Sequence, residues 1–256
     1  MYAQAGIKRL FEKGNRIMLT IEKTVLPSPD QWEIIIEGMR NPMNSWDKSD
    51  SYTTHIEDPE TKETADCAHF VGENDLDLMR RLAAGGSVHA KYRRMIPVYV
   101  TINAPLYWWK EFDTYKVGTV ANSCSTMHKI HAKEFTLDDF SHDHLEDDWN
   151  DLRSLVDYND EYGNTPKDVL DWIVFALNEY RDQYLATKDK KHWWQMIQLL
   201  PSSYNQKRTV MLNYEVLVNI YRWRRDHKLD EWHTFCDWIE RLPYSELITG
   251  KGCDVA

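Results

Sequence analysis

A stretch rich in hydroxyl side chains, TYKVGTVANSCSTMHKI at residues 114–130, holds the first candidates for chemistry. Cys124 lies within it, and His128 follows four residues later. A thiolate needs a base or a cationic neighbour to act as a nucleophile, and a single cysteine is weak evidence for one. The stretch has neither a helical nor an alternating period. Its composition leaves two interpretations open, a surface turn or a polar loop that holds a ligand.

A second cluster has the residue types of a metal site: His142, His144, Glu146, Asp147 and Asp148. Two histidines two residues apart do not share one face of a helix, and no second cluster has zinc-like spacing. We therefore predict a solvated acidic loop across residues 136–151 and no metal ion.

Two further stretches carry glycines and arginines. Residues 85–91, GGSVHAK, match neither a phosphate-binding loop nor a dinucleotide fingerprint, so their glycines indicate a helix stop. Arg222, Arg224 and Arg225 lie near an expected helix C-terminus. They are either a solvated basic end or an anion site, since guanidinium groups bind phosphate through two parallel hydrogen bonds. No Ser/His/Asp arrangement is recognisable.

Composition narrows the classes of function. The net charge of −10 argues against general nucleic-acid binding but leaves room for a small anionic ligand. No run approaches the roughly 18 apolar residues that cross a membrane, so we expect no membrane span. Residues 1–17 lack the apolar core of a secretion signal. The four cysteines are scattered, which favours a reducing cytoplasm.

The pattern of apolar residues predicts an α+β fold that is mostly helical, with a small antiparallel or mixed sheet. We expect one domain, residues 18–256, after an N-terminal extension of residues 1–17. Strands are predicted at 18–26 and at 95–103, where MIPVYVTIN alternates apolar and polar side chains. Pro97 places the second strand at a sheet edge, or marks its start. Residues 46–66 are predicted to be a loop.

Seven helices are expected, each with a start or stop signal or an apolar stripe. Ser28 and Pro29 begin the first, Asn74 caps the second before Gly85, and Thr165 caps the clearest one. The predicted ranges are 29–40, 74–84, from Ala104-Pro105 to about Phe112, from Pro166, about 190–199, about 207–225 and about 229–241.

The order of these elements resembles the flavin-dependent thymidylate synthases. That family has a helix, a histidine-bearing turn, a strand ending in Ala-Pro, an aromatic helix and the signature R-H-R-x-x-S-x-N-x-x-S-x-R. The corresponding segments here are LMRRLAAGGSVHAKYRR, MIPVYVTINAP, LYWWKEFD and TYKVGTVANSCSTM, residues 78–127. A second segment, KRTVMLNYEVLVNIYRWRR, keeps the family intervals between Asn213, Asn219 and Arg224. Together the two segments cover about half of the chain.

The signature is eroded, which marks a divergent member. Thr114-Tyr115-Lys116 stands where the family has Arg-His-Arg, and Thr126 stands at its last arginine. Two registers remain open after Val120, one with Ala121 and Cys124 at the family asparagine and second serine, the other with Asn122 and Ser125 there. Glu111 stands where the family has a glutamine near the nucleotide, and Lys91 where it has a threonine that contacts the flavin.

The resemblance implies a cytoplasmic homotetramer that binds FAD beside dUMP and uses methylenetetrahydrofolate and NADPH to make dTMP. It implies no nucleic-acid or membrane partner. Glu111 and Arg224 are then the candidate catalytic residues, and with Ser125 the candidate substrate contacts. The candidate flavin contacts are His89, Lys91, Tyr115, Lys116, Asn213 and Asn219.

Three other functions remain open. The chain could be a related flavoenzyme acting on another pyrimidine nucleotide, an inactive relative kept for nucleotide binding or assembly, or an unrelated α+β binding protein. Glu111 bears on the first, because an ionised carboxylate only accepts hydrogen bonds, whereas a glutamine amide also donates. It would favour a base edge that presents donors, unless Glu111 instead pairs with a nearby Lys or Arg.

Overall fold

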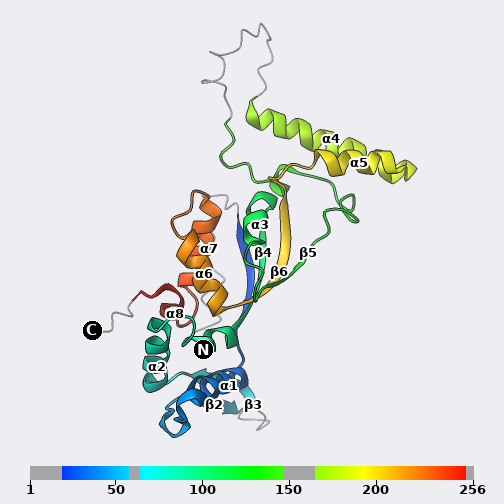
Figure 1. Ribbon diagram of the computed structural model, residues 1–256. Helices are drawn as coiled ribbons and strands as arrows, with labels where there is room; N and C mark the ends of the chain where they lie inside the picture. The colour runs from blue at the N-terminus through cyan, green and yellow to red at the C-terminus, as the bar shows by residue number, and fades with distance from the viewer. Residues whose placement is uncertain (1–18, 58–63, 147–164, 252–256) are drawn as a thin grey trace. The chain divides into compact units, whose positions relative to one another are not determined.

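The computed structural model describes residues 19–57, 64–146 and 165–251 (Figure 1). The predicted N-terminal extension lies outside this part. The chain divides into two compact units, which are considered separately. The larger unit comprises residues 21–103, 108–124 and 207–256, and the smaller unit comprises residues 1–20, 104–107 and 125–206. Within the described residues, no helix is long and apolar enough to cross a membrane.

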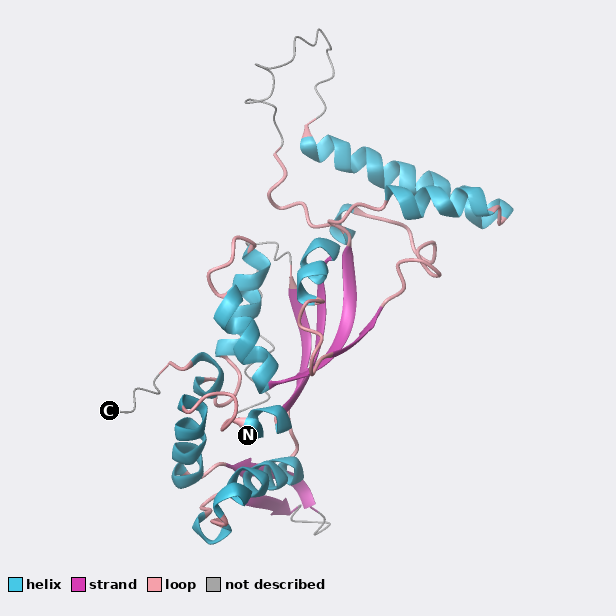
Figure 2. Cartoon of the chain, in the orientation of Figure 1, coloured by secondary structure: helices cyan, strands magenta, loops and turns pink. Residues whose placement is uncertain are grey.

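A four-stranded sheet runs in the order β1-β4-β6-β5 and is drawn in magenta in Figure 2. Its strands are β1 (Thr20–Val25), β4 (Pro97–Pro105), β6 (Asn205–Asn213) and β5 (Val120–Ser123). Pro97 is the first residue of β4, which confirms the prediction that this proline marks the start of the strand. The alternative prediction of an edge strand is wrong, because β4 lies between β1 and β6. The alternation along β4 is confirmed, since Val98, Val100 and Ile102 are at most 1% exposed.

The predicted helix across 207–225 is wrong for residues 207–213. Residues up to Asn213 belong to β6, which pairs antiparallel with β5 with Val120 opposite Met211. Only α6 (Tyr214–Arg224) is helical, and the Asn213 side chain caps it by accepting a hydrogen bond from the Val216 amide at 3.1 Å. The alternating burial of Val210 and Leu212 is the strand period, which overrides helix propensity here.

Among the described residues, six helices precede, separate or follow these strands in the sequence of the larger unit. They are α1 (Pro29–Arg40), α2 (Glu73–Ala84), α3 (Leu106–Phe112), α6, α7 (Asp230–Glu240) and α8 (Glu246–Thr249). The predicted Ser28 cap of α1 is confirmed, with Ser28 and Gln31 forming a reciprocal capping box. Short 3-10 turns lie at Asn41–Met43, Trp46–Lys48 and η3 (Lys91–Met95).

The loop predicted for residues 46–66 is wrong. β2 (Tyr52–Glu57) and β3 (Thr64–Phe70) pair antiparallel in a separate two-stranded sheet, with Tyr52 opposite Phe70. The rings of this pair stack at 5.3 Å. Cross-strand pairs of this kind stabilise a hairpin whose polar sequence shows no clear hydrophobic period.

The cap predicted at Asn74 is also wrong, because α2 begins one residue earlier, after Gly72. The Asp50 carboxylate accepts hydrogen bonds from the amides of Asn74 and Asp75 at 2.9 and 3.1 Å. It thus satisfies two of the free N–H groups that every helix start exposes. A side chain at Gly72 would collide with Asp50, so this distant cap requires glycine there.

One buried ion pair ties α1 to α2. Arg40 Nε lies 2.5 Å from Asp75 Oδ1, and both side chains are almost fully buried. Hydroxyl groups of Ser49 and Ser51 donate to Asp75 Oδ2 at 2.7 and 2.6 Å. Burial alone would raise the pKa of Asp75, but the hydrogen bonds from Ser51, Ser49 and Arg40 outweigh it and hold that pKa below its usual value.

The smaller unit contains a helical hairpin of α4 (Pro166–Thr187) and α5 (Lys190–Leu199). The predicted Thr165 cap is confirmed as a capping box with Asp168. A core of Leu170, Leu177 and Met196 joins these helices to Ile130, Phe135 and Phe140. Of the predicted acidic loop, a 3-10 turn at Leu137–Asp139 is described, while residues 147–151 lie outside the described ranges. Helices and a small sheet confirm the predicted α+β class.

The Asp75 network makes a stability prediction. Replacing Asp75 with Ala leaves Arg40 buried without its partner, which we expect to cost about 3–5 kcal/mol of unfolding free energy in urea titrations. Asp77→Ala, which breaks only the exposed pair with Arg81, is the matched control and should change little. Equal losses in both variants would contradict the assignment.

The same network makes a pH prediction. Because the folded-state pKa of Asp75 is depressed, its stabilisation is present above the unfolded pKa of about 4 and is lost as pH falls through the folded value. The difference in stability between wild type and Asp75→Asn should therefore shrink as the solution is acidified below pH of about 4. A difference that grows on acidification would refute this sign.

Candidate functional site

The Glu111 carboxylate, near the end of α3, accepts hydrogen bonds from side chains of two other helices of the larger unit. Glu111 Oε2 lies 2.5 Å from Arg224 Nη1 on α6, and it accepts a hydrogen bond from the Trp232 indole on α7 at 3.2 Å. His227 Nε2, between those helices, lies 3.3 Å away. The other oxygen, Oε1, has no hydrogen-bond partner among the described residues. Oε2 of Glu111 is thus engaged by protein donors, and Oε1 can still accept a hydrogen bond.

Arg224 is held by more than this ion pair. Its Nε donates to the Tyr115 hydroxyl at 2.8 Å. Its guanidinium carbon lies 4.7 Å from the centre of the Trp232 ring and 5.6 Å from that of Tyr115. A cation over aromatic faces gains about 0.5–2 kcal/mol per contact, depending on how far it is desolvated. With its side chain only 16% exposed, Arg224 has a fixed direction and N–H groups left to donate.

The aromatic core explains why Glu111 lies where it does. Trp108, Trp109 and Phe112 are at most 1% exposed, and Trp108 packs against Trp232 at 4.7 Å. These buried rings fix the face of α3, and Glu111 lies at the border of the core. The α3 helix then ends in a turn, with the Thr114 hydroxyl donating to the Glu111 carbonyl at 2.7 Å. This turn brings Tyr115 back toward Arg224.

The loop after Tyr115 approaches the start of α6. Gly118 has φ +80°, and a Cβ there would lie 3.2 Å from Asn213 Nδ2 and from Val216. Asn213 uses its side-chain oxygen to cap α6, so its Nδ2 group faces the loop. Glycine is required because the backbone is in the left-handed region and the space is tight.

The other predicted contacts in the larger unit are exposed. His89 follows Gly85 and Gly86 in the turn after α2, and Lys91 begins η3. Lys116 projects from the loop and Asn219 from α6. Asn219 and Arg224 are five residues apart on α6, which turns them about 140° from each other, so they do not converge on one point.

Ser125 belongs to the smaller unit, where its hydroxyl accepts hydrogen bonds from the amides of Met127 and His128 at 3.3 and 2.9 Å. Cys124 is exposed and is the last residue of the 108–124 segment of the larger unit. Cys236 is buried, and desolvation raises the pKa of its thiol to about 12, so it is no nucleophile. Among the described ranges, no group of three His, Cys, Asp or Glu side chains could hold a metal ion, while Asp147 and Asp148 lie outside those ranges.

Sequence reasoning missed two members of the cluster. Trp232 lies in the helix predicted at about 229–241, but nothing in the sequence linked its indole N–H to Glu111. His227 lies in a polar turn that carries no motif. Both reach Glu111 only through the packing of α7 beside α3, which joins residues more than 110 positions apart in the chain.

Comparison with solved structures identifies the fold. The chain is similar to the flavin-dependent thymidylate synthase ThyX from Helicobacter pylori complexed with FAD and dUMP, at 15% identity and a TM-score of 0.54, over 92% of this chain and 98% of that one. It is also similar to a UMP/dUMP methylase, PolB from Streptomyces cacaoi, bound with 5-Br dUMP, at 13% identity and a TM-score of 0.55, over 92% and 95%.

No protein-family model matches the sequence, and comparison with curated proteins gives no match. The likeness to ThyX and PolB shows that the chain has the fold of the flavin-dependent thymidylate synthases. The resemblance seen in the sequence is thereby confirmed for the fold.

Gly118 gives a direct test of the loop geometry. Gly118→Ala should destabilise the protein through both the positive φ and the contact at 3.2 Å, by about 1–2 kcal/mol, measured by urea unfolding. Gly86→Ala is the control, since Gly86 has φ +88° with open space around it and carries the φ cost alone. A loss no larger than that of the control would show that the loop does not lie against Asn213.

Proposed function

We propose that this chain is a flavin-dependent enzyme that methylates a pyrimidine nucleotide, converting dUMP to dTMP with methylenetetrahydrofolate and NADPH. The observation that supports this most is the fixed guanidinium of Arg224, held by Glu111 and Tyr115 within a fold shared with proteins solved with dUMP or 5-Br dUMP. Arginine suits the planar acceptor groups of phosphate and of a uracil edge.

The residues present fit a flavin in their chemistry. Tyr115 offers an aromatic face, and Asn213 has an amide N–H group left after capping α6. Lys116 and Lys91 are exposed cations that suit the phosphates, with His89 and Asn219 as further polar contacts. When bound, the flavin supplies the one-carbon carrier and the electrons of the methyl transfer. The chain's own groups bind and orient the reactants, which is the protein's share in cofactor enzymes.

Arg224 and Glu111 have distinct roles in this proposal. Arg224 binds the nucleotide through the N–H groups that Glu111 and Tyr115 do not use. Glu111 Oε2 positions Arg224, and Oε1 remains to accept a hydrogen bond from the base. The substrate contact predicted at Ser125, which lies in the smaller unit, stays a prediction.

A related substrate is the second candidate function. The free oxygen of Glu111 can accept but not donate while ionised, which favours an amino-bearing pyrimidine such as that of dCMP. Calorimetry with dUMP and dCMP decides between the two. A clear preference for dUMP that is unchanged in Glu111→Gln would remove the base-reading role of Glu111.

A third candidate is an inactive relative that only binds nucleotide or assists assembly. It is favoured by the neutral side chains of Thr114 and Thr126 where the family signature has arginines, and by the engagement of Arg224 with Glu111. Rescue of a thymidine-requiring bacterial strain separates the first candidate from this one and from the second.

The proposed homotetramer has support in the smaller unit. Trp172 and Phe175 on α4 are 63% and 56% exposed, and their rings contact each other at 5.9 Å. Exposed aromatic pairs of this kind are typical of subunit interfaces. Sedimentation should give a tetramer, and Trp172→Glu should shift it to smaller species. A monomeric wild type would contradict this part of the proposal.

The flavin spectrum tests the proposed function itself. The purified chain incubated with FAD and desalted should retain the yellow flavin absorption band. Lys116→Ala should lower the retained flavin several-fold, because it removes an unshielded cation from the loop. Lys23→Ala, an exposed lysine on β1, is the matched control. A wild-type protein that stays colourless would refute the flavin-dependent readings.

A further inference from the structure

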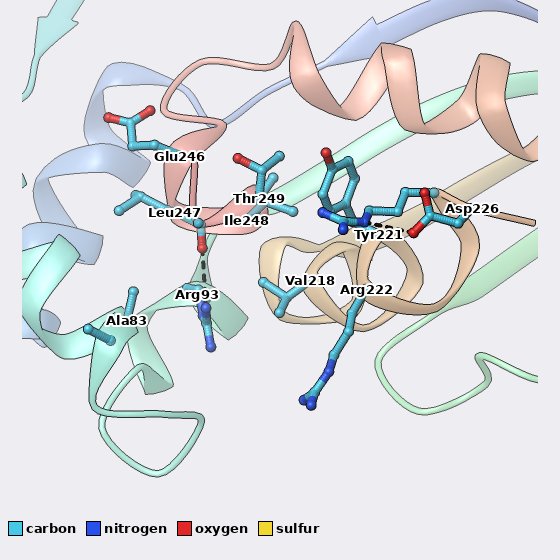
Figure 3. Close-up of a pocket in the computed structure, with 13 residues that line it drawn as sticks. Ala83, Arg93, Val218, Tyr221, Arg222, Asp226, Glu246, Leu247, Ile248 and Thr249 are labelled. Carbon is cyan, nitrogen blue, oxygen red and sulfur yellow. Dashed lines mark hydrogen bonds and ion pairs between the residues drawn. The ribbon is translucent and has the colours of Figure 1, made fainter. Parts of the chain in front are cut away.

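A second hollow lies on the larger unit, away from the Glu111 and Arg224 cluster. It measures about 390 Å³, within the range typical of small-ligand pockets. Figure 3 shows it between α6, α8, the end of α2 and η3. Arg222 lines it, and this residue lies two positions before Arg224 on α6. Two positions turn a side chain by about 200°, so the two arginines serve opposite faces of the helix.

Three arginines line this hollow: Arg93, Arg222 and Arg225. In Figure 3 the side chains of Arg93 and Arg222 extend in the same direction, one from η3 and one from α6, with Val218 between them. Guanidinium groups suit phosphate because each can donate two parallel hydrogen bonds to its oxygens.

Arg93 is buried and held in place by protein contacts. Only 6% of the residue is exposed, its Nη1 donates to the Leu247 carbonyl at 3.2 Å, and its Nη2 lies 2.8 Å from Glu215. Its Nε group is buried and has no hydrogen-bond partner among the described residues. A buried N–H group without a partner costs about 1–3 kcal/mol, but this atom has almost no accessible surface, so Arg93 can offer a ligand only its terminal N–H groups.

The charges around the hollow do not cancel. Arg80, Arg93 and Arg225 pair with Glu246, Glu215 and Asp226, respectively. Arg80 lies beside the hollow without lining it, and Arg222 is the remaining arginine of the lining. Within the described ranges no carboxylate pairs with Arg222, whose guanidinium lies 5.4 Å from the Trp223 ring. Four cations against three anions leave one positive charge, on the exposed side chain of Arg222.

The rest of the lining is mixed: Asp226, Glu246 and Thr249 are polar, and one wall is apolar. Ala83, Ala84, Leu247 and Ile248 cover the wall that the arginines leave open, beside the ring of Tyr221. Such a wall accommodates a flat or apolar group but offers it few hydrogen bonds. Charge and lining together match a molecule with one phosphate and one apolar or aromatic part.

We propose that this hollow binds a small phosphate monoester such as a mononucleotide, with Arg222 and Arg93 holding the phosphate and the apolar wall holding the remainder. This site does not include Glu111 or Arg224, so the proposal does not depend on the proposed flavin and substrate site.

The test is calorimetric titration of the full-length protein with adenosine 5′-monophosphate, inorganic phosphate and adenosine. We expect the monophosphate to bind, phosphate alone to bind more weakly and adenosine alone to bind least. Arg222→Gln should weaken monophosphate binding about tenfold or more, the effect of one lost charge-assisted hydrogen bond. Arg241→Gln is the matched control, an exposed arginine at the end of α7 that does not line the hollow, and it should bind as wild type does.

Three results would overturn the proposal: no monophosphate binding at millimolar concentration, equal affinity for adenosine and its monophosphate, or equal weakening in Arg222→Gln and Arg241→Gln. Ala83→Phe gives a second test, because it obstructs the apolar wall without changing charge. It should reduce monophosphate binding while leaving phosphate binding intact. Flavin retention measured on Arg222→Gln should equal that of wild type, which separates a failure here from a failure of the proposed function.

Discussion

The larger unit depends on one constraint, the burial of a cluster of aromatic rings that also carries polar groups at its border. Trp108 and Trp232 pack ring to ring in the core, yet the indole N–H of Trp232 points to Glu111. The ion pair of Glu111 with Arg224 is therefore attached to the buried aromatic core of the unit. A partly buried pair costs desolvation, which is repaid only when the geometry is good and the remaining groups are satisfied. The Tyr115 hydroxyl and the Trp232 indole meet these conditions in part, since Glu111 Oε1 and some N–H groups of Arg224 have no partner among the described residues.

This attachment has a consequence for function. Arginine loses rotational freedom when it binds an anion, and that loss is already incurred when the side chain is held in place by its own protein. Arg224 is held in this way by its contacts with Glu111 and Tyr115. The ion pair with Glu111 partly neutralises the charge of Arg224. Its contribution to binding an anion therefore depends more on the fixed orientation of its N–H groups than on long-range electrostatic attraction. An eroded arginine signature is compatible with ligand binding if the remaining arginine is fixed.

Local signals were sufficient to predict much of the fold. Ser28 with Pro29 and Thr165 with Pro166 predicted the starts of α1 and α4, because capping and proline act within a few residues. The alternation in β4 predicted its buried face. The order of these elements also carried the resemblance to the flavin-dependent thymidylate synthases, whose fold the chain shares.

Features that depend on distant residues were not predictable. Asp50 caps α2 from a separate segment, and β6 is a strand because it pairs with β4 and β5. For the candidate site, the sequence singled out Glu111 and Tyr115 through resemblance alone, and Arg224 also as one of three clustered arginines. It could not show that they contact one another, because the contacts arise when α3, α6 and α7 share one aromatic core.

The central claim is that Glu111 and Arg224 act as one unit in nucleotide binding. A double-mutant cycle on dUMP affinity, measured with FAD-loaded wild type, Glu111→Gln, Arg224→Ala and the double variant, tests it most directly. We expect Arg224→Ala to weaken dUMP binding at least tenfold, and Glu111→Gln to have much less effect once Arg224 is absent. Wild-type affinity in Arg224→Ala, or strictly additive effects of the two substitutions, would contradict the account.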